Sequence, residues 1–323
     1  MIDRIPSIDI VRFSTSGTEA IQTALRGARV FTGRNLIMKM DGSYHGSGDI
    51  AEYDSFVSPV RKGLSPHIDK EVVIGYFNDE RTFQIIDQYK DQLAAVIVEG
   101  VMGAAGIIPP ENGFLNQLQE KCRQYGIVFI LDEVISFRLA NAGAQEIYGL
   151  EPDITTLGKV VGGGMAVGAF GGRADIMSVF NPSKPNAVHH SGTFAGTPIA
   201  AAAGIAMLKK YQGETIIHLN EKGNQFAEDL KDLIYEYNLP LTVTHIGSLL
   251  NLHAIDTPIK TVDDVRRGNQ TVLQAIQLAM LNEGVFFPKR GMMSLSTAIT
   301  TDEFEFVLAM FDRVFKKYSM FIE

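Results

Sequence analysis

The first two-thirds of the chain alternates short apolar runs with segments of helical periodicity. Helical patterns cover residues 16–33 and 112–125. The apolar runs lie at 9–14, 35–40, 93–100 and 126–134, with two shorter ones on either side of the glycines at 162–164. Short apolar strands that alternate with helices form a mostly parallel sheet covered by helices on both faces. We therefore predict an α/β fold for this part.

The last third of the chain has a different pattern. Short strand patterns near 241–255 stand between helical patterns at 220–238, 269–284 and 300–318. Because a chain of 323 residues exceeds the usual size of a single core, two domains are expected. We predict a large domain over 1–210 and a smaller C-terminal α+β domain over 211–323.

Composition excludes several classes of partner. The formal net charge is −8 and no run of basic residues occurs, so a nucleic-acid or anionic membrane surface is not expected. No apolar segment is long enough to span a bilayer. The single cysteine, Cys122, excludes an internal disulfide framework, and the first residues lack the pattern of a signal peptide. We expect a cytoplasmic protein.

Polar residues follow each of the first three predicted strands, where an open parallel sheet binds its ligands. Ser16, Gly17 and Thr18 start a predicted helix, whose free N–H groups suit a phosphate; an ordinary Ser/Thr helix cap is the alternative. Tyr44 and His45 lie in a glycine-flanked loop, where an aromatic ring can lie against a planar ligand or simply form a turn. Glu99 ends the third strand as a pocket carboxylate or a solvated charge.

Asp132 and Lys159 follow the next two strands. A carboxylate directly behind apolar residues needs a cationic or hydrogen-bonding partner. Mg²⁺ would suit it, but the chain has no phosphate-binding loop around Lys159, so no metal is expected. The lysine amine, the carboxylate, the phosphate-binding turn and the flat aromatic face together meet the needs of pyridoxal phosphate.

Five motifs in order resemble one family. "SGTEA" (16–20), "GSYHG" (42–46), "LDEV" (131–134), "TLGK" (156–159) and "GTFAGTPIA" (192–200) resemble the class III aminotransferases, which are fold-type I pyridoxal-phosphate enzymes. The resemblance is strongest to the glutamate-1-semialdehyde aminomutase branch and runs from about Val11 to the C-terminal helix.

This resemblance assigns roles to individual residues. It implies that Lys159 forms the Schiff base and moves the proton, and that Asp132 keeps the pyridine nitrogen protonated. Val134 and Tyr44 would pack on the two ring faces, with His45 nearby. The resemblance also implies that Glu99 lies beside the ring hydroxyl and that the phosphate contacts Ser16, Gly17, Thr18 and, from the partner subunit of a homodimer, Thr193.

Two departures from the family pattern bear on activity. Ser16 stands only 15 residues after Met1, whereas the family carries a longer segment there that contributes substrate contacts. In the C-terminal part, Gly291 aligns near a substrate-binding glutamate of the aminomutases, which favours transfer to a separate keto acid. Arg290 or Lys289 would then bind a substrate carboxylate, or form a solvated basic turn.

The leading hypothesis is an aminotransferase that moves an amino group from an amine or a β-, γ- or ω-amino acid to a keto acid. Two alternatives stay open at this point. One is the intramolecular glutamate-1-semialdehyde 2,1-aminomutase reaction. The other is a shortened homologue that binds the cofactor without turnover.

Overall fold

The computed structural model describes residues 1–56 and 62–319. They form two compact units. The first holds Met1–Ala104 and Pro110–Gly213, and the second holds Ala105–Pro109 and the chain from Glu214 onward. The short segment Ala105–Pro109 thus leaves the first unit and returns to it, which no pattern in the sequence indicated.

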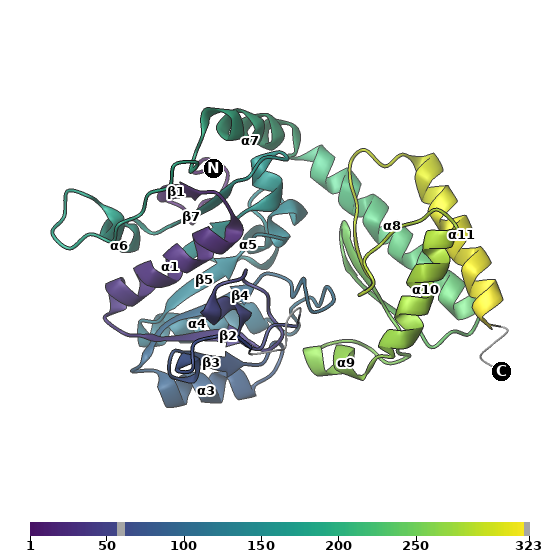
Figure 1. The fold of residues 1–323 in the computed structure, drawn as a ribbon, viewed down its shortest axis with the longest axis horizontal. Helices are drawn as coiled ribbons and strands as arrows, with labels where there is room; N and C mark the ends of the chain where they lie inside the picture. Colours follow the sequence, from purple (N-terminus) through teal and green to yellow (C-terminus); the bar gives the residue numbers. More distant parts are fainter. Residues whose placement is uncertain (57–61, 320–323) are drawn as a thin grey trace. The chain divides into compact units, whose positions relative to one another are not determined.

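The first unit is built on a seven-stranded, mostly parallel sheet (Figure 1), which confirms the predicted α/β class. In spatial order its strands are β1 (Ile10–Ser14), β7 (Gly168–Gly172), β6 (Ile154–Leu157), β5 (Val128–Asp132), β4 (Leu93–Glu99), β2 (Leu36–Met40) and β3 (Val72–Gly75). Strand β7 is antiparallel to both of its neighbours, β1 and β6, whereas the pairs from β6 to β3 are all parallel. The sequence did not indicate β3.

The sheet is covered on both faces, as a parallel sheet requires. Every residue of β2, β4 and β5 is buried. Helix α1 (Gly17–Thr32) packs Ala20, Ala24 and Ala28 against alternate residues of the strands, including Ile97 and Ile130. Because side chains alternate between the faces of a strand, Glu99 and Asp132 project on the same face as Ile97 and Ile130.

Short helices complete the first unit. Its further α-helices are α2 (Asp49–Glu52), α3 (Arg81–Tyr89), α4 (Phe114–Tyr125), α5 (Ala144–Tyr148), α6 (Ala174–Met177) and α7 (Pro198–Lys210). Its 3₁₀ turns are η1 (Ile68–Lys70), η2 (Ser136–Leu139), η3 (Lys159–Gly162) and η4 (Ser178–Phe180).

The second unit packs four helices with a three-stranded antiparallel sheet. The strands are ordered β10 (Met292–Ser294), β9 (Leu249–His253) and β8 (Thr242–Ile246). The helices are α8 (Glu214–Glu236), α9 (Val262–Arg267), α10 (Gln270–Asn282) and α11 (Thr301–Ser319). After α10, Gly284 adopts the left-handed conformation that its position predicts (φ 86°).

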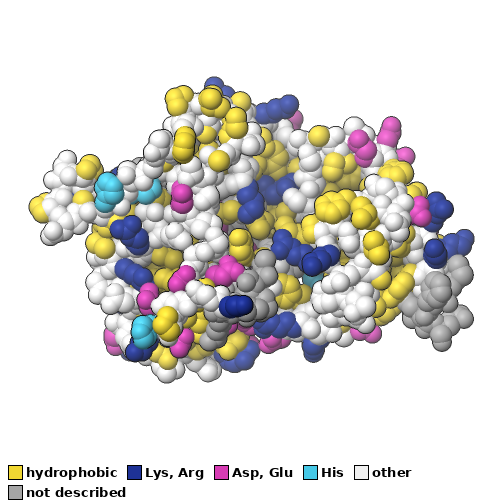
Figure 2. Space-filling model, viewed as in Figure 1, with side chains coloured by type: hydrophobic (Ala, Val, Ile, Leu, Met, Phe, Trp, Pro, Cys, Tyr) yellow, Lys and Arg dark blue, Asp and Glu magenta, His cyan; other side chains and the backbone are white. Residues whose placement is uncertain are grey.

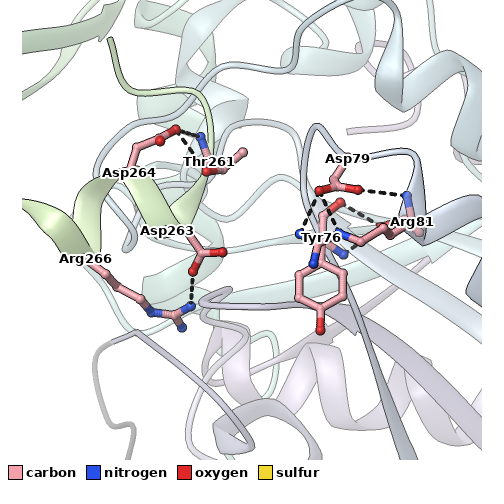
Figure 3. A network of polar contacts seen from close by, with 8 residues as sticks. Tyr76, Asp79, Arg81, Thr261, Asp263, Asp264 and Arg266 are labelled. Carbon is pink, nitrogen blue, oxygen red and sulfur yellow. Dashed lines mark hydrogen bonds and ion pairs between the residues drawn. The ribbon is translucent and has the colours of Figure 1, made fainter. Parts of the chain in front are cut away.

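In each unit, the start of one helix is held by a carboxylate (Figure 3). In the first unit, Asp79 accepts hydrogen bonds from the backbone N–H (2.8 Å) and the guanidinium (2.9 Å) of Arg81, the first residue of α3. In the second unit, Asp264 accepts from the backbone N–H of Thr261 (2.8 Å), forming a capping box at α9. Such contacts shape the helices and leave the chemistry to other residues.

No helix within the described residues is long and apolar enough to cross a membrane.

Candidate active site

The predicted site residues of the first unit meet at the carboxyl ends of neighbouring strands. Glu99 of β4 and Asp132 of β5 are register partners, and Asp132 in turn pairs with Thr156 of β6. A cavity of about 250 Å³ opens there, lined by Gly17, Thr18, Ile21, Tyr44, His45, Gly46, Glu99, Asp132, Val134, Ile135 and Lys159. Ligands bind at this edge in open α/β sheets because loops diverge from the strand ends.

Asp132 is held from two sides. One carboxylate oxygen lies 2.7 Å from Nδ1 of His45, and the other accepts the backbone N–H of Val134 at 3.0 Å. Both side chains of the pair are almost fully buried, with 4% of Asp132 and 1% of His45 exposed. A desolvated carboxylate that has these two partners among the described residues attracts a further cation or N–H donor strongly.

Two buried polar atoms around this pair have no hydrogen-bond partner among the described residues. They are Nε2 of His45, on the far side of the ring from Asp132, and Oγ1 of Thr156, on the strand next to Asp132. Buried polar atoms in native proteins are nearly always satisfied, so orphaned atoms concentrate at sites that bind something.

Glu99 organises the loops around the cavity. One of its carboxylate oxygens accepts the backbone N–H of Tyr44 at 3.1 Å, and the other accepts that of Gly103 at 2.9 Å. Burial raises the pKa of Glu99, an effect that the nearby His45 opposes. Glu99 therefore couples the loop after β2 to the loop after β4.

Two glycine positions make the cavity wall compact. A Cβ on Gly46, whose φ is 95°, would lie 2.3 Å from Oγ1 of Thr18. A Cβ on Gly17 would lie 3.1 Å from the Val134 side chain. Position 46 requires glycine, whereas a Cβ at position 17 would only crowd Val134, so the Tyr44–His45 loop and Val134 both lie close to the start of α1.

Lys159 stands directly after β6 in an unusual backbone conformation. Its φ is 49°, in the left-handed region that residues with a Cβ rarely adopt. It begins the 3₁₀ turn η3, and its side chain is largely exposed. Strained backbone of this kind costs about 1–3 kcal/mol and is concentrated at functional sites.

The remaining predicted residues lie outside the lining of this cavity. The hydroxyl of Ser16 accepts the N–H of Glu19 at 3.2 Å and caps α1, the alternative that its sequence allowed. Thr193 is exposed in the loop before α7. In the second unit, Gly291 has a φ of 89°, and a Cβ there would lie 2.0 Å from the carbonyl oxygen of Leu252, so that position requires glycine.

Ile21 and Ile135 line the cavity but were not predicted. Ile21 belongs to the apolar face of α1, and Ile135 follows a strand end like many core residues. Nothing in their local sequence separates them from ordinary core residues.

Lys159, the buried Asp132 and the start of α1 thus line one cavity. Comparison with known proteins narrows the class. The model of the family "Aminotransferase class-III" matches residues 1–314. The chain belongs to this family, and the resemblance noted in the sequence is confirmed.

Individual relatives agree with this assignment. Glutamate-1-semialdehyde 2,1-aminomutase 2 of Geobacillus kaustophilus is 38% identical over 327 residues, which are 98% of this chain and 76% of the relative. The crystal structure of an omega-transaminase from Sphaerobacter thermophilus is similar with a TM-score of 0.93 and 34% identity, covering 98% of this chain and 76% of that one. A β-phenylalanine aminotransferase from Variovorax paradoxus follows, with a TM-score of 0.91, 34% identity, and 99% and 73% coverage.

Proposed function

We propose that this aminotransferase moves an amino group from an amine or a β-, γ- or ω-amino acid to a keto acid, using pyridoxal phosphate held at Lys159. The cofactor follows from the family and from similar solved structures, one described as a transaminase with PLP bound and another as an aminomutase in complex with PMP. The donor class is supported by the omega-transaminase and β-phenylalanine aminotransferase among those structures. The observation that carries the proposal is the single cavity that Lys159, the Asp132–His45 pair and the start of α1 share.

The residues present fit this cofactor. Its pyridine N–H matches the Asp132 carboxylate, which is buried and, within the described part of the chain, accepts from one backbone N–H besides its contact with His45. Its phosphate matches the free N–H groups and positive dipole end of α1 at Gly17 and Thr18, with Ser16 shaping that turn. The two half-buried side chains of Tyr44 and Val134 would contact the ring faces.

Bound pyridoxal phosphate supplies an electron sink for charge that develops on the substrate carbon. The role of Asp132 is to hold a proton on the ring nitrogen, and His45 fixes the orientation of that carboxylate. Glu99 restrains the loop that carries Tyr44 and would border the ring hydroxyl of the cofactor. The amine of Lys159 would hold the cofactor, and its Nζ would carry a proton between two atoms of the substrate.

Replacing Lys159 tests the proposal directly. With added pyridoxal phosphate, the wild-type protein should gain the visible absorbance of a lysine-bound cofactor, and Lys159→Ala should not. Turnover should fall about 1,000-fold or more, as loss of a general acid–base group predicts. Lys184→Ala, an exposed lysine of the same unit, is the matched control. Equal spectra for the wild-type protein and Lys159→Ala would refute the proposal.

The intramolecular aminomutase reaction is the second candidate, because curated relatives that are 37–38% identical to this chain carry that name. Gly291 opposes it, since its backbone and the Leu252 carbonyl leave no room for an acidic side chain. Incubation with glutamate-1-semialdehyde alone tests the mutase, and an amine or β-amino acid with pyruvate or 2-oxoglutarate tests the transferase. Turnover of the first only would make the chain a mutase; turnover of neither would favour binding without catalysis.

A homodimer in the cytoplasm is part of the proposal. Support comes from apolar side chains on the surface of the first unit, where Phe194, Ile199 and Ile205 are more than half exposed. Figure 2 shows hydrophobic side chains gathered over α7. Thr193 lies beside this surface in the chain and would contact the partner's cofactor phosphate. Sedimentation of the wild-type protein and Ile205→Asp tests this, with a monomeric wild type as the contrary result.

A further inference from the structure

A second lysine of the first unit lies buried beneath the site. Lys39, on β2, has no exposed surface. Its ammonium donates to the backbone carbonyls of Ser43 (3.2 Å), Ala51 (2.7 Å) and Tyr53 (2.6 Å). An ammonium has three N–H donors, and here each has one acceptor. The arrangement is a complete hydrogen-bonded cage.

The three carbonyls belong to one segment of the chain, residues 43–53, which follows β2. Ser43 immediately precedes Tyr44 and His45, whereas Ala51 and Tyr53 lie at the end of the short helix α2. Lys39 therefore ties together both ends of segment 43–53. Within that segment, the backbone N–H of Tyr44 donates a hydrogen bond to Glu99, and Nδ1 of His45 is hydrogen-bonded to Asp132.

A charge in this position is costly. Burial lowers the pKa of Lys39 to about 8, although Glu99, Asp54, Glu52 and Asp41 all act to raise it. Among the described residues, no carboxylate lies within ion-pair distance of its amine. An apolar residue such as Met would fill the same space without the desolvation cost. What a lysine adds is the three donors to segment 43–53.

We propose that Lys39 is a positioning residue of the active site, whose ammonium holds segment 43–53 so that Tyr44 and His45 are in place before the cofactor binds. The effect on the cofactor rests on the proposed function. The structural part of the inference, the ordering of the segment, does not depend on catalysis.

Hydrogen exchange on the cofactor-free protein tests the structural part. In Lys39→Met, amides of residues 43–53 should exchange about tenfold faster than in the wild type, because three buried carbonyls lose their donors. Lys39→Arg keeps the charge and several donors, so it should restore part of the protection. Leu118→Ala in α4 is the control, since it opens a core cavity in the same unit and lies on an element other than β2 and segment 43–53.

Cofactor affinity tests the functional part. The dissociation constant for pyridoxal phosphate should rise about tenfold in Lys39→Met at pH 7 and stay near the wild-type value in Leu118→Ala. Equal weakening in both variants would show that Lys39 contributes stability alone, which overturns the proposal. Unchanged exchange and affinity in Lys39→Met would overturn it as well.

The pH dependence gives a readout that remains if Lys39→Met folds poorly at neutral pH. Above about pH 8 the wild-type amine is neutral and has only two donors, so one carbonyl loses its partner. Exchange from residues 43–53 of the wild type, corrected for intrinsic rates, should therefore speed up between pH 7 and 9.5. The affinity ratio of Lys39→Met to wild type should narrow over the same interval, and a constant ratio would contradict the role of the ammonium.

The two proposals fail in different ways. If the wild type binds no pyridoxal phosphate at any pH, the proposed function fails, whereas the exchange measurement on Lys39 still gives its answer. If the cofactor binds and the exchange of residues 43–53 depends neither on replacing Lys39 nor on its protonation, only the present inference fails.

Discussion

Two histidines are buried in this chain, one in each unit, and their surroundings differ. His45, in the strand-end cavity of the first unit, contacts a buried carboxylate through Nδ1, and its Nε2 has no partner within the described residues. His253, on β9 of the second unit, has Nε2 3.1 Å from the carbonyl oxygen of Gly106 and 2.9 Å from the hydroxyl of Thr244. The same carbonyl also accepts the Thr244 hydroxyl at 2.6 Å.

The difference separates polar groups that are placed to bind a ligand from polar groups that stabilise the fold. At His253 each polar atom named is bonded to another within the second unit. Burial lowers the pKa of His253 to about 4, so the ring is neutral at pH 7. At His45 the ring and its carboxylate keep unused hydrogen-bonding capacity facing a cavity, which costs stability and is retained at sites that bind a ligand.

Asp132→Asn tests the cavity of the first unit, and its effect on turnover should be the largest effect in this comparison of the two units. The amide keeps the size of the side chain and can still accept the N–H of Val134, but it loses the charge beside His45. Turnover should fall about 100-fold or more, the cost of removing one preorganised electrostatic partner. The unfolding free energy should change by only about 1 kcal/mol. Kinetics and urea unfolding measure the two effects.

Asp153→Asn is the matched control at the opposite end of the strands. Asp153 accepts the N–H of Phe129 at 2.9 Å and forms an ion pair with Arg173 at 2.6 Å. Its replacement should lower stability by about 1 kcal/mol and leave turnover unchanged. Similar losses of activity in both variants would mean that Asp132 acts only through the fold.

The pH dependence of stability tests the surroundings of His253 in the second unit. With its pKa lowered from 6.5 to about 4, folded His253 binds fewer protons than the unfolded chain between these values. Stability from this residue is therefore complete above about pH 6.5 and is lost as pH falls toward 4, by about 2–3 kcal/mol. Urea unfolding of wild type and His253→Gln at pH 7 and pH 4.5 tests this. Parallel pH curves for the two proteins would contradict it.

The sequence predicted the architecture well where local patterns carry it. Alternation of apolar runs and helices predicted the parallel sheet, and Ser16 caps α1, which is the alternative that its sequence allowed. The antiparallel direction of β7 escaped prediction because a strand looks the same in either direction. The segment Ala105–Pro109 escaped because its place in the second unit depends on His253 and Thr244, more than 130 residues away.

For the site, the sequence supplied residue types but no contacts. The strand-end rule brought Asp132, Glu99, Tyr44 and His45 to one edge, because it depends only on chain direction. Lys39 was missed, since a lysine inside "NLIMKM" reads as the exposed position of a strand. Only the fold reveals that three carbonyls surround its amine.

Gly106→Ala should act on stability alone and tests whether His253 is a fixed part of the second unit. Gly106 has a φ of 124°, and a Cβ there would lie 2.5 Å from Cε1 of His253. Gly113 has a φ of 70° and no atom within 4 Å of such a Cβ, so Gly113→Ala reports backbone strain alone. We expect Gly106→Ala to lower the unfolding free energy by about 1–2 kcal/mol more than Gly113→Ala.

Because Gly106 lies in the loop that begins after Glu99, a loss of cofactor affinity in Gly106→Ala would also show that the two histidine environments are coupled through that loop. Equal losses of stability in both variants would mean that the His253 ring yields to the added methyl group, and that its contact with Gly106 is loose.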